Sequence, residues 1–566
     1  MQPDASNTSD SRRQFLEATA AGAIGLTTGL LASPNADATR SGDALGVLSV
    51  ASGQTIRKAS TGDSHLRRKT TNALQPGSKL WLFFDIRQGA ANGQATSPAE
   101  PNFVSVRVHR QPAAADAIRT RGAGNWGIRT FDLLPAAPEF LHLIELTLDR
   151  PVTAGQTLDF RIENWTGPRQ PINPFQFWLV VDHRAEWDLV ETGYRSYCHF
   201  VTRDRAGRVA TADLFAHTLT AAVTVTGEYT PVPKISHRKT PGVFWGEFHG
   251  MVFNQRSLDD YYNYARQVTR LDFCAPMWFS YNTCVENVWD EVKAASRRHT
   301  RPGEFAAIAA FECGTPPDGS HRCILFRDPD NVPPIFCDER PPAQEPFFQN
   351  RFHPDTILCQ SVEDLYAAVA RHGGIVTGHF HTLQYHAEVL CEMFQKNLVN
   401  PADEEERLYE LLRSGHRFAL AGTSDTHDSM PGNPLPEPHL PMPAGFTGVH
   451  ADELTTDALF DAVLARRIYA TSGARILMKF HSNDRPMGAE LPRHAPREFA
   501  IEIDGTANLQ TVELLRNGRP IQQWQPGTSA FSITAADNDQ TDPAFYLVRV
   551  TQTDEHKGWT SPIWFG

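Results

Sequence analysis

The stretch Val-Phe-Trp-Gly-Glu-Phe-His at residues 243–249 decides the fold of the central part of this chain. It is a short apolar run that ends in a carboxylate and an imidazole. Three later apolar runs repeat the pattern: 305–311 before Glu312, 374–378 before His379 and His381, and 418–422 before Asp425 and His427. Because the carboxyl ends of successive parallel strands meet at one edge of an α/β fold, these side chains are expected to share a site.

The residue types at these four strand ends are typical of metal ligands. Imidazole nitrogens and carboxylate oxygens together suit Zn²⁺, Mn²⁺ or Fe. A single pair of this kind also occurs at capped strand ends and in surface loops. Four such endings in chain order favour a metal site over that alternative.

Length and charge limit the classes of protein to consider. With 566 residues the chain is too long for one ordinary core, so several domains are expected. The formal net charge is −12, and the longest basic run is the short Arg67-Arg68-Lys69. Proteins that bind nucleic acid normally carry a basic face, so no nucleic-acid partner is expected.

The first 38 residues resemble a bacterial twin-arginine export signal. Arg12-Arg13 precedes a mildly apolar stretch from Ala18 to Ala32 and the small-x-small site Ala36-Asp37-Ala38. The apolar stretch is shorter than the roughly 20 residues of a membrane span. We therefore expect the twin-arginine machinery as a partner, a periplasmic or secreted location, and no transmembrane anchor in the mature chain.

Three further segments differ in their patterns. Residues 39–235 contain short strand-like runs between Pro and Gly turns, which indicates a β-sandwich-like domain. Residues 236–475 alternate strand-like and helical runs, with Ser257 and Ser361 as expected helix N-caps. Residues 476–566 return to strand-like runs, which indicates a C-terminal β domain.

The central segment resembles the PHP (polymerase and histidinol phosphatase) metal-dependent hydrolases, and most closely the secreted, uncharacterised DUF3604 family. The motifs that carry the likeness are Trp245-Gly246-Glu247-Phe248-His249-Gly250, Glu312 with Gly319-Ser320-His321-Arg322, Ser424-Asp425-Thr426-His427, 466–475 and the terminal Ser561-Pro562-Ile563-Trp564. The resemblance implies a distorted (β/α)₇ barrel, here flanked by N-terminal and C-terminal β-sandwich-like domains. It also implies divalent metals that activate water against a phosphoester.

The resemblance also implies roles for individual residues. The expected metal ligands are His249, Glu312, His321, His379, His381, Asp425 and His427. For a metal-dependent hydrolase we further expect Glu312 as a bridging carboxylate, Asp425 and His427 as ligands that orient water, and Arg322, next to His321, beside an anionic leaving group.

Two positions depart from the superfamily pattern. Met251 stands where the opening His-x-His would have its second histidine, and Met277-Trp278-Phe279 stands where Thr-Asp-His is expected. A thioether is a poor ligand for hard metals. We therefore expect one or two ions rather than three, and the apolar patch would suit a bulkier substrate.

Seven of the eight cysteines lie in the central segment, and only Cys198 lies outside it. The sequence has no Cys-x-x-Cys motif, so it does not indicate a ribbon-type zinc site. Buried thiols, disulfides and, least favoured, thiolate ligation all remain open from the sequence.

The sequence thus predicts an exported metal-dependent hydrolase, in first place of phosphoester type. One alternative is a hydrolase with the same site that acts on a non-phosphate ester, an amide or a glycan-linked substrate. The other is a metal-degenerate protein whose β domains bind glycans or a partner. Fold analogy alone does not decide among them.

Overall fold

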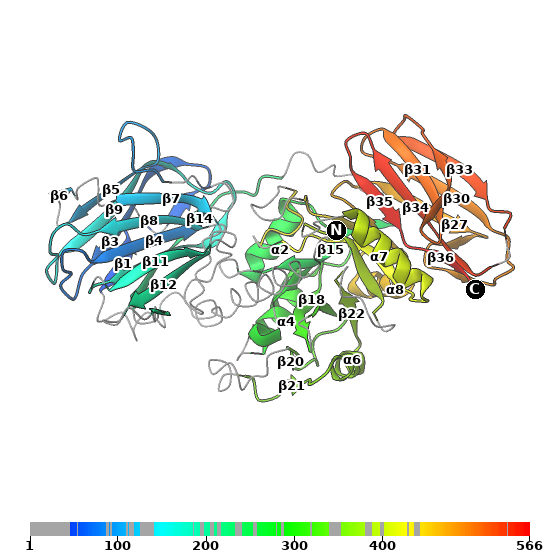
Figure 1. Ribbon diagram of the computed structural model, residues 1–566, viewed down its shortest axis with the longest axis horizontal. Coiled ribbons are helices and arrows are strands. Elements are labelled where there is room, and N and C mark those ends of the chain that lie inside the picture. Colours follow the sequence, from blue (N-terminus) through cyan, green and yellow to red (C-terminus); the bar gives the residue numbers. More distant parts are fainter. Residues whose placement is uncertain are drawn as a thin grey trace, which may run out of the picture. The chain divides into compact units, whose positions relative to one another are not determined.

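The computed structural model describes a chain that divides into two compact units, Met1–Thr230 with Phe253–Asp260, and Pro231–Val252 with Tyr261–Gly566 (Figure 1). The described residues are 46–566 without 52, 54, 86–89, 91–92, 109–110, 113–117, 125–140, 185, 193–196, 204–208, 212–216, 232–239, 253–256, 279, 285–287, 317–319, 339–351, 380–387, 397–400, 427–428, 435–441 and 540–541. The export signal predicted at residues 1–38 therefore lies outside them.

The first unit is built from strands. A five-stranded sheet has the order β1 (Val47–Val50), β3 (Thr61–Lys69), β9 (Thr157–Thr166), β5 (Phe103–Val108) and β6 (Gln111–Pro112). A six-stranded sheet has the order β2 (Thr55–Arg57), β14 (Thr218–Thr226), β10 (Ile172–Asp182), β4 (Lys79–Asp85), β8 (Leu141–Thr147) and β7 (Ile118–Gly124). A small sheet contains β11 (Trp187–Thr192), β12 (Tyr197–Arg203) and β13 (Val209–Thr211).

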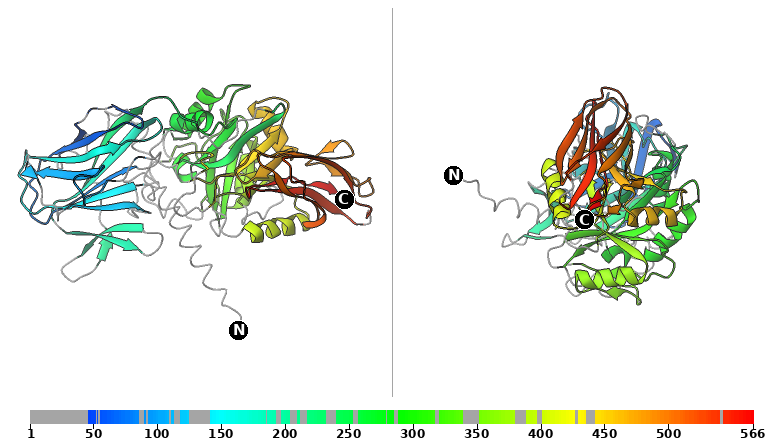
Figure 2. Two further views of the ribbon diagram at one scale, coloured as in Figure 1. Left: turned by 90° about the horizontal axis from the view of Figure 1, so that it is seen from above. Right: turned by 90° about the vertical axis from the view of Figure 1, so that its right-hand side faces the viewer.

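The two larger sheets of this unit pack face to face (Figures 1 and 2). Their inward side chains form one apolar core, which contains Leu66 and Phe160 from one sheet and Leu82 and Phe177 from the other. Alternation of buried and exposed residues along β5 follows from the two-residue period of a strand.

The second unit contains two main sheets. The larger sheet has eleven strands: β17 (Ala306–Ala307), β16 (Phe273–Met277), β15 (Val243–Met251), β25 (Phe446–His450), β26 (Ile468–Thr471), β35 (Lys557–Thr560), β34 (Ala544–Gln552), β31 (Leu509–Arg516) and β32 (Arg519–Trp524), with β29 (Glu490–Leu491) and β36 (Ile563–Phe565) paired beside them. The five-stranded sheet has the order β18 (Ala309–Thr315), β19 (Ser320–Phe326), β22 (Gly374–Gly378), β23 (Leu390–Phe394) and β24 (Ala419–Gly422).

Smaller elements complete the second unit. Two short sheets pair β20 (Ile335–Phe336) with β21 (Ile357–Leu358), and join β28 (Arg485–Pro486), β27 (Leu477–Ser482), β30 (Glu498–Asp504) and β33 (Ala530–Ala536). The described helices are α2 (Leu258–Gln267), which begins in the first unit by the division above, α3 (Ser280–Thr283), α4 (Val288–His299), α6 (Val362–Arg371), α7 (Pro401–Arg413) and α8 (Thr456–Leu464).

The predicted caps begin two of these helices. The Ser257 hydroxyl accepts a hydrogen bond from the Asp260 amide, and the Ser361 hydroxyl accepts one from the Asp364 amide. Each cap satisfies a backbone donor that the first turn of a helix leaves free.

Strand directions in the second unit are mixed. β15, β16 and β17 run parallel, as do β22, β23 and β24. β18, β19 and β22 alternate in direction, and so do β15, β25 and β26. The expectation of parallel units therefore holds for part of this α/β segment, which is mostly sheet.

Among the hydrogen bonds that join the two main sheets, one comes from β18 and one from β25. The Glu312 amide of β18 donates to the Trp278 carbonyl just after β16, at 2.7 Å. The Thr447 hydroxyl of β25 donates to the Gly422 carbonyl of β24, at 2.8 Å. Buried side chains from β15, from β18 and from the residues just after β22 and β24 lie close together.

The segment after residue 475 continues the larger sheet. β26 pairs with β35 between Tyr469 and Thr560, and the Leu420 amide of β24 donates to the Ser561 hydroxyl at 3.0 Å. A shared apolar core contains Leu408 and Phe418 together with residues beyond position 475, such as Trp559. One sheet and one core thus cross the domain boundary predicted at 475/476.

Candidate metal centre

His249 lies in β15 where the strand is irregular. The register of β15 against β16 shifts between Glu247 and Gly250, and such bulges re-aim side chains beside functional sites. The His249 side chain is fully buried, and its Nδ1 lies 2.7 Å from Glu392 Oε1. Its Nε2 has no hydrogen-bond partner. Buried nitrogens rarely lack one, so this atom points to a missing ligand.

Glu312, in the middle of β18, contacts three imidazoles. Its Oε1 lies 2.8 Å from His321 Nδ1 and 3.0 Å from His379 Nε2. Its Oε2 lies 3.6 Å from His249 Nε2. The carboxylate is 1% exposed, so these contacts are screened from water.

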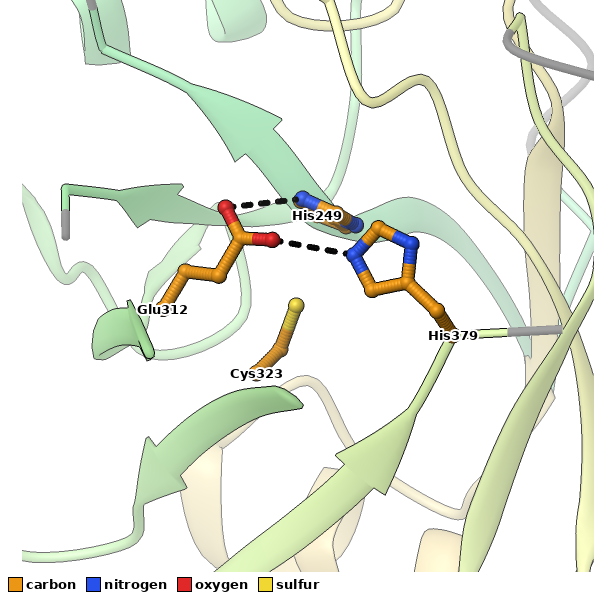
Figure 3. Close-up of side chains that lie close together, drawn as sticks. All are labelled: His249, Glu312, Cys323 and His379. Atoms are coloured by element: carbon orange, nitrogen blue, oxygen red, sulfur yellow. Dashed lines mark hydrogen bonds and ion pairs between the residues drawn. The ribbon is translucent and has the colours of Figure 1, made fainter. Parts of the chain in front are cut away.

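Cys323 contributes a sulfur to the same cluster. It lies directly opposite Glu312 in the antiparallel pair of β18 and β19, so both side chains leave the same face of the sheet. One donor atom from each of His249, Glu312, Cys323 and His379 lies within 4.8 Å of every other. Figure 3 shows the sulfur directed toward the space between the Glu312 carboxylate and the His379 ring.

Asp425 approaches the cluster from the loop after β24. Its amide donates to the His249 carbonyl at 2.8 Å, and its Oδ1 lies 3.2 Å from His249 Nε2. Neither this oxygen nor Glu312 Oε2 forms a hydrogen bond with Nε2. The Asp425 φ of 46° lies in the left-handed region, which aspartate tolerates better than most residues.

The electrostatics of the cluster follow from burial and close opposite charges. Burial alone would raise the pKa of Glu312, but His321 and His249 hold it well below its usual range. Burial alone would lower the pKa of His249, but Cys323, Glu392 and Asp425 raise it well above its usual value. The cluster therefore favours positive charge at the imidazoles, which is charge that a bound cation would supply in place of protons.

These donors fit a divalent metal ion. Two imidazoles, a carboxylate and a sulfur converge, and His249 Nε2, which forms no hydrogen bond, is buried among them. Nitrogen, oxygen and sulfur donors in this combination suit first-row transition metals. The second nitrogen of His249 is held by Glu392, as is usual for metal-binding histidines.

The structure brings together most of the predicted ligands. Those that gather around the cluster are His249, Glu312, His321, His379 and Asp425. Two others, His381 and His427, lie outside the described residues.

Arg322 faces away from this cluster. Adjacent residues of a strand point to opposite faces, so Arg322 leaves β19 on the side opposite His321 and Cys323. Its guanidinium donates to Glu388 Oε1 at 2.9 Å and to the Tyr366 hydroxyl at 3.1 Å. The Arg322 guanidinium is thus paired with a buried carboxylate. This geometry gives no support to the predicted role of Arg322 beside a leaving group.

Sequence reasoning missed two polar residues of the site and gave little weight to a third. Glu392 holds His249, and the Gln395 amide nitrogen lies 2.9 Å from Glu392 Oε2 and 3.4 Å from His379 Nδ1. A carboxylate inside the apolar run Leu390–Phe394 was a usable signal, because an unpaired buried charge is costly. Cys323 was considered a ligand only as the least favoured reading.

The two departures from the superfamily pattern lie at adjacent positions. Met251 of β15 and Met277 of β16 oppose each other in register, and both are buried. Phe279 lies outside the described residues. Apolar side chains thus occupy the described positions of both motifs, Met251, Met277 and Trp278.

A comparison with known protein families finds a match to the segment that contains β24 and Asp425. A family model described as a protein of unknown function (DUF3604) matches residues 415–496, which include β24, Asp425, β25 and β26. The predicted resemblance to DUF3604 is confirmed. The matched segment of this DUF3604-like chain supplies one of the strand ends that meet at the cluster.

Curated relatives are themselves uncharacterised. A Chlamydia pneumoniae protein is 23% identical over 359 residues, which is 57% of this chain and 57% of that protein. A Chlamydia trachomatis protein is 31% identical over 138 residues, which is 21% of this chain and 22% of that protein. The matched parts thus cover little more than half of these relatives at most.

Among solved structures, one similar chain is a two-domain protein containing a predicted PHP-like metal-dependent phosphoesterase from Bacteroides vulgatus. It aligns with a TM-score of 0.31 and 10% identity, covering 58% of this chain and 99% of that chain.

None of the helices in the described part of the present chain has the length and apolar character that a membrane span requires.

Proposed function

We propose that this chain is a metal-dependent hydrolase that cleaves phosphoesters. The observation that carries the proposal is the buried cluster of His249, Glu312, Cys323 and His379, with a buried imidazole nitrogen that forms no hydrogen bond. The DUF3604 motifs, which resemble those of PHP hydrolases, give the reaction class. A divalent metal in such a site supplies Lewis-acid polarisation and lowers the pKa of water.

The residues of the chain have separate roles in this proposal. Glu312 holds His321 and His379 on one oxygen and faces His249 with the other. Glu392 fixes the His249 ring, so that Nε2 points into the cluster. Asp425 accepts or holds a proton at Oδ1 beside that nitrogen and would orient a water there. The buried walls keep bulk water out, which strengthens each of these contacts.

The fold proposed for the site is a distorted (β/α)₇ barrel. Support comes from the two main sheets of the second unit, which are joined through Glu312 at one place and through Thr447 at another. The site would then belong to residues 236–475, between β-rich segments at 39–235 and 476–566.

The hydrolase proposal is tested with the purified full chain. We expect bound divalent metal by elemental analysis, and hydrolysis of at least one class in a panel of phosphomonoesters and phosphodiesters. Glu312→Gln should lower both metal affinity and the rate by more than about 100-fold, since it removes a ligand rather than an outer contact. The exposed Glu363→Gln is the matched control.

Two outcomes contradict this proposal. Cleavage of carboxylic esters, amides or glycosides but not of phosphoesters would support a hydrolytic metal site and reject phosphoesters as its substrates. Absence of bound metal together with absence of any hydrolysis would indicate a binding protein instead.

We further propose export by the twin-arginine route, supported by Arg12-Arg13 and the Ala36-Asp37-Ala38 site. Replacing Arg12 and Arg13 by Lys should trap an uncleaved precursor in the cytoplasm. Cell fractionation and N-terminal sequencing check this, with a mature end near Thr39 expected. Exported protein that still begins before Arg12 would contradict the proposal.

A further inference from the structure

Cysteine sulfurs occupy different environments in the second unit. All seven described cysteines are buried and free, and Cys323 is the one among them that joins the described donor cluster. Cys313 leaves β18 on the other face, where its Sγ lies 3.7 Å from the Arg322 carbonyl. The Cys391 Sγ lies 3.9 Å from the His379 carbonyl, which it contacts as a weak donor.

We propose that Cys323 is a metal ligand, bound as a thiolate, and that its sulfur makes the site select Zn²⁺ over Mn²⁺ and Mg²⁺. This inference rests on the proposed metal-dependent function and specifies the ion that it uses. The family resemblance predicts that His321 is the metal ligand from β19, and it assigns no role to Cys323.

The backbone of three strands fixes the position of the sulfur. Cys323 lies opposite Glu312 on β18 and opposite Thr377 on β22. His379 follows Thr377 by two residues, at the end of β22. Because the side-chain direction in a strand repeats every two residues, Glu312, Cys323 and His379 reach the same side of the sheet.

An independent feature shows that the cluster is built for a ligand. His249 Nε2 is fully buried, lacks a hydrogen-bond partner and belongs to the same close group of donors as the sulfur. Glu392 engages the other ring nitrogen. A carboxylate behind a histidine is the usual outer support of a metal-binding imidazole.

The chemistry of the four donors selects among metals. Two nitrogens, one oxygen and one sulfur match the ligands and the number that Zn²⁺ takes in proteins. Mg²⁺ and Mn²⁺ prefer carboxylate, carbonyl and water oxygens. On binding, the Cys323 thiol releases one proton to solvent, and the resulting thiolate places a negative charge beside the ion.

Cobalt substitution tests the ligand directly. Co²⁺ replaces Zn²⁺ in such sites, and a thiolate ligand gives a strong sulfur-to-cobalt absorption in the near ultraviolet. We expect this absorption in the full-length wild type and in Cys313→Ser, and its loss in Cys323→Ser while Co²⁺ stays bound. Cys323→Ser should also lower Zn²⁺ affinity by more than about 100-fold, since it removes a ligand rather than an outer contact, and Mn²⁺ affinity by less than about threefold.

The outcomes separate this inference from the proposed function. Co²⁺ bound to the wild type without the sulfur absorption, or an absorption that survives in Cys323→Ser, overturns the thiolate ligand and leaves the hydrolase intact. Failure of the wild type to bind Co²⁺, Zn²⁺ or Mn²⁺ overturns both. Thermal unfolding checks that each variant is folded, and if Cys323→Ser is not, the wild-type spectrum alone decides.

Discussion

At the scale of single residues, the environment of each side chain decides whether a polar group has a structural or a chemical role. His249 and His142 are both fully buried imidazoles. His249 faces three carboxylates and a thiol, and its pKa rises. His142 lies in the apolar core of the first unit, where it accepts a hydrogen bond from the Gly93 amide. Its burial lowers its pKa to about 4.

Asp425 provides a prediction about the site. Asp425→Asn keeps the size of the side chain and tolerates its left-handed backbone, but removes the negative charge 3.2 Å from His249 Nε2. We expect metal affinity to fall by at least about tenfold, with thermal stability nearly unchanged. Titration with metal and calorimetry measure the two effects.

The exposed Asp452→Asn serves as the control for this change. If Asp425→Asn binds metal as the wild type does, Asp425 is a loop residue and not a ligand. Loss of activity with normal metal content would instead assign it to substrate binding.

His142 provides a prediction about pH. The unfolded chain binds a proton at this residue near pH 6.5 and the folded chain only near pH 4, so acid favours unfolding within that window. As the pH falls from 7 to 5, protonation of this residue in the unfolded chain should lower the free energy of unfolding by about 2 kcal/mol. His142→Gln should remove that part of the pH dependence, measured by urea unfolding at both pH values. Equal pH dependence in the two proteins would contradict it.

At the scale of elements, the site depends on close contacts between strand ends. β24 delivers Asp425, and its last residue Gly422 lies against backbone atoms of the neighbouring strands. A Cβ at Gly422 would lie 2.5 Å from the Phe446 carbonyl oxygen and 2.6 Å from that of Thr471. Backbone atoms cannot move aside as a flexible side chain can.

Gly422→Ala should therefore displace the end of β24. We expect a loss of about 1–3 kcal/mol in unfolding free energy, as for overpacked cores, together with weaker metal binding through Asp425. Gly62→Ala in β3 is a control, since nothing lies near a Cβ there. Unfolding and metal titration of both variants check the prediction, which fails if the two variants behave alike.

At the scale of the whole molecule, the segment beyond residue 475 is part of the structure that supports the site. The Ser561 hydroxyl accepts from the Leu420 amide of β24 and donates to the Ile468 carbonyl of β26. Trp559 and Trp564 pack in the same core as Phe418 and Leu420. Removing this segment would expose a large apolar surface and an unpaired edge of β26.

We therefore predict different behaviour for two fragments. Residues 231–475 should aggregate or lack a cooperative unfolding transition, while residues 231–566 should unfold cooperatively. Circular dichroism during heating and gel filtration distinguish the two. A soluble, cooperatively folding 231–475 would support the domain boundary that the sequence predicts at 475/476.

The sequence by itself determined much about the local structure. Short apolar runs at 243–249, 305–311, 374–378 and 418–422 correspond to β15, to β17 and the start of β18, to β22 and to β24. These strands are recognisable because each buries both faces and so consists almost entirely of apolar residues. A polar residue that ends or interrupts such a strand can be recognised in the sequence because its neighbours are apolar.

Only the tertiary structure decided which atoms meet. Strand register, which sets whether Arg322 or Cys323 lies on the same face as Glu312, is defined by the pairing of β19 with β18 and with β22. The continuation of one sheet from β26 into β35 joins residues almost 90 positions apart. Local sequence carries no record of such partners, because sheet pairing is non-local and the free energy of a contact appears only when both segments are in place.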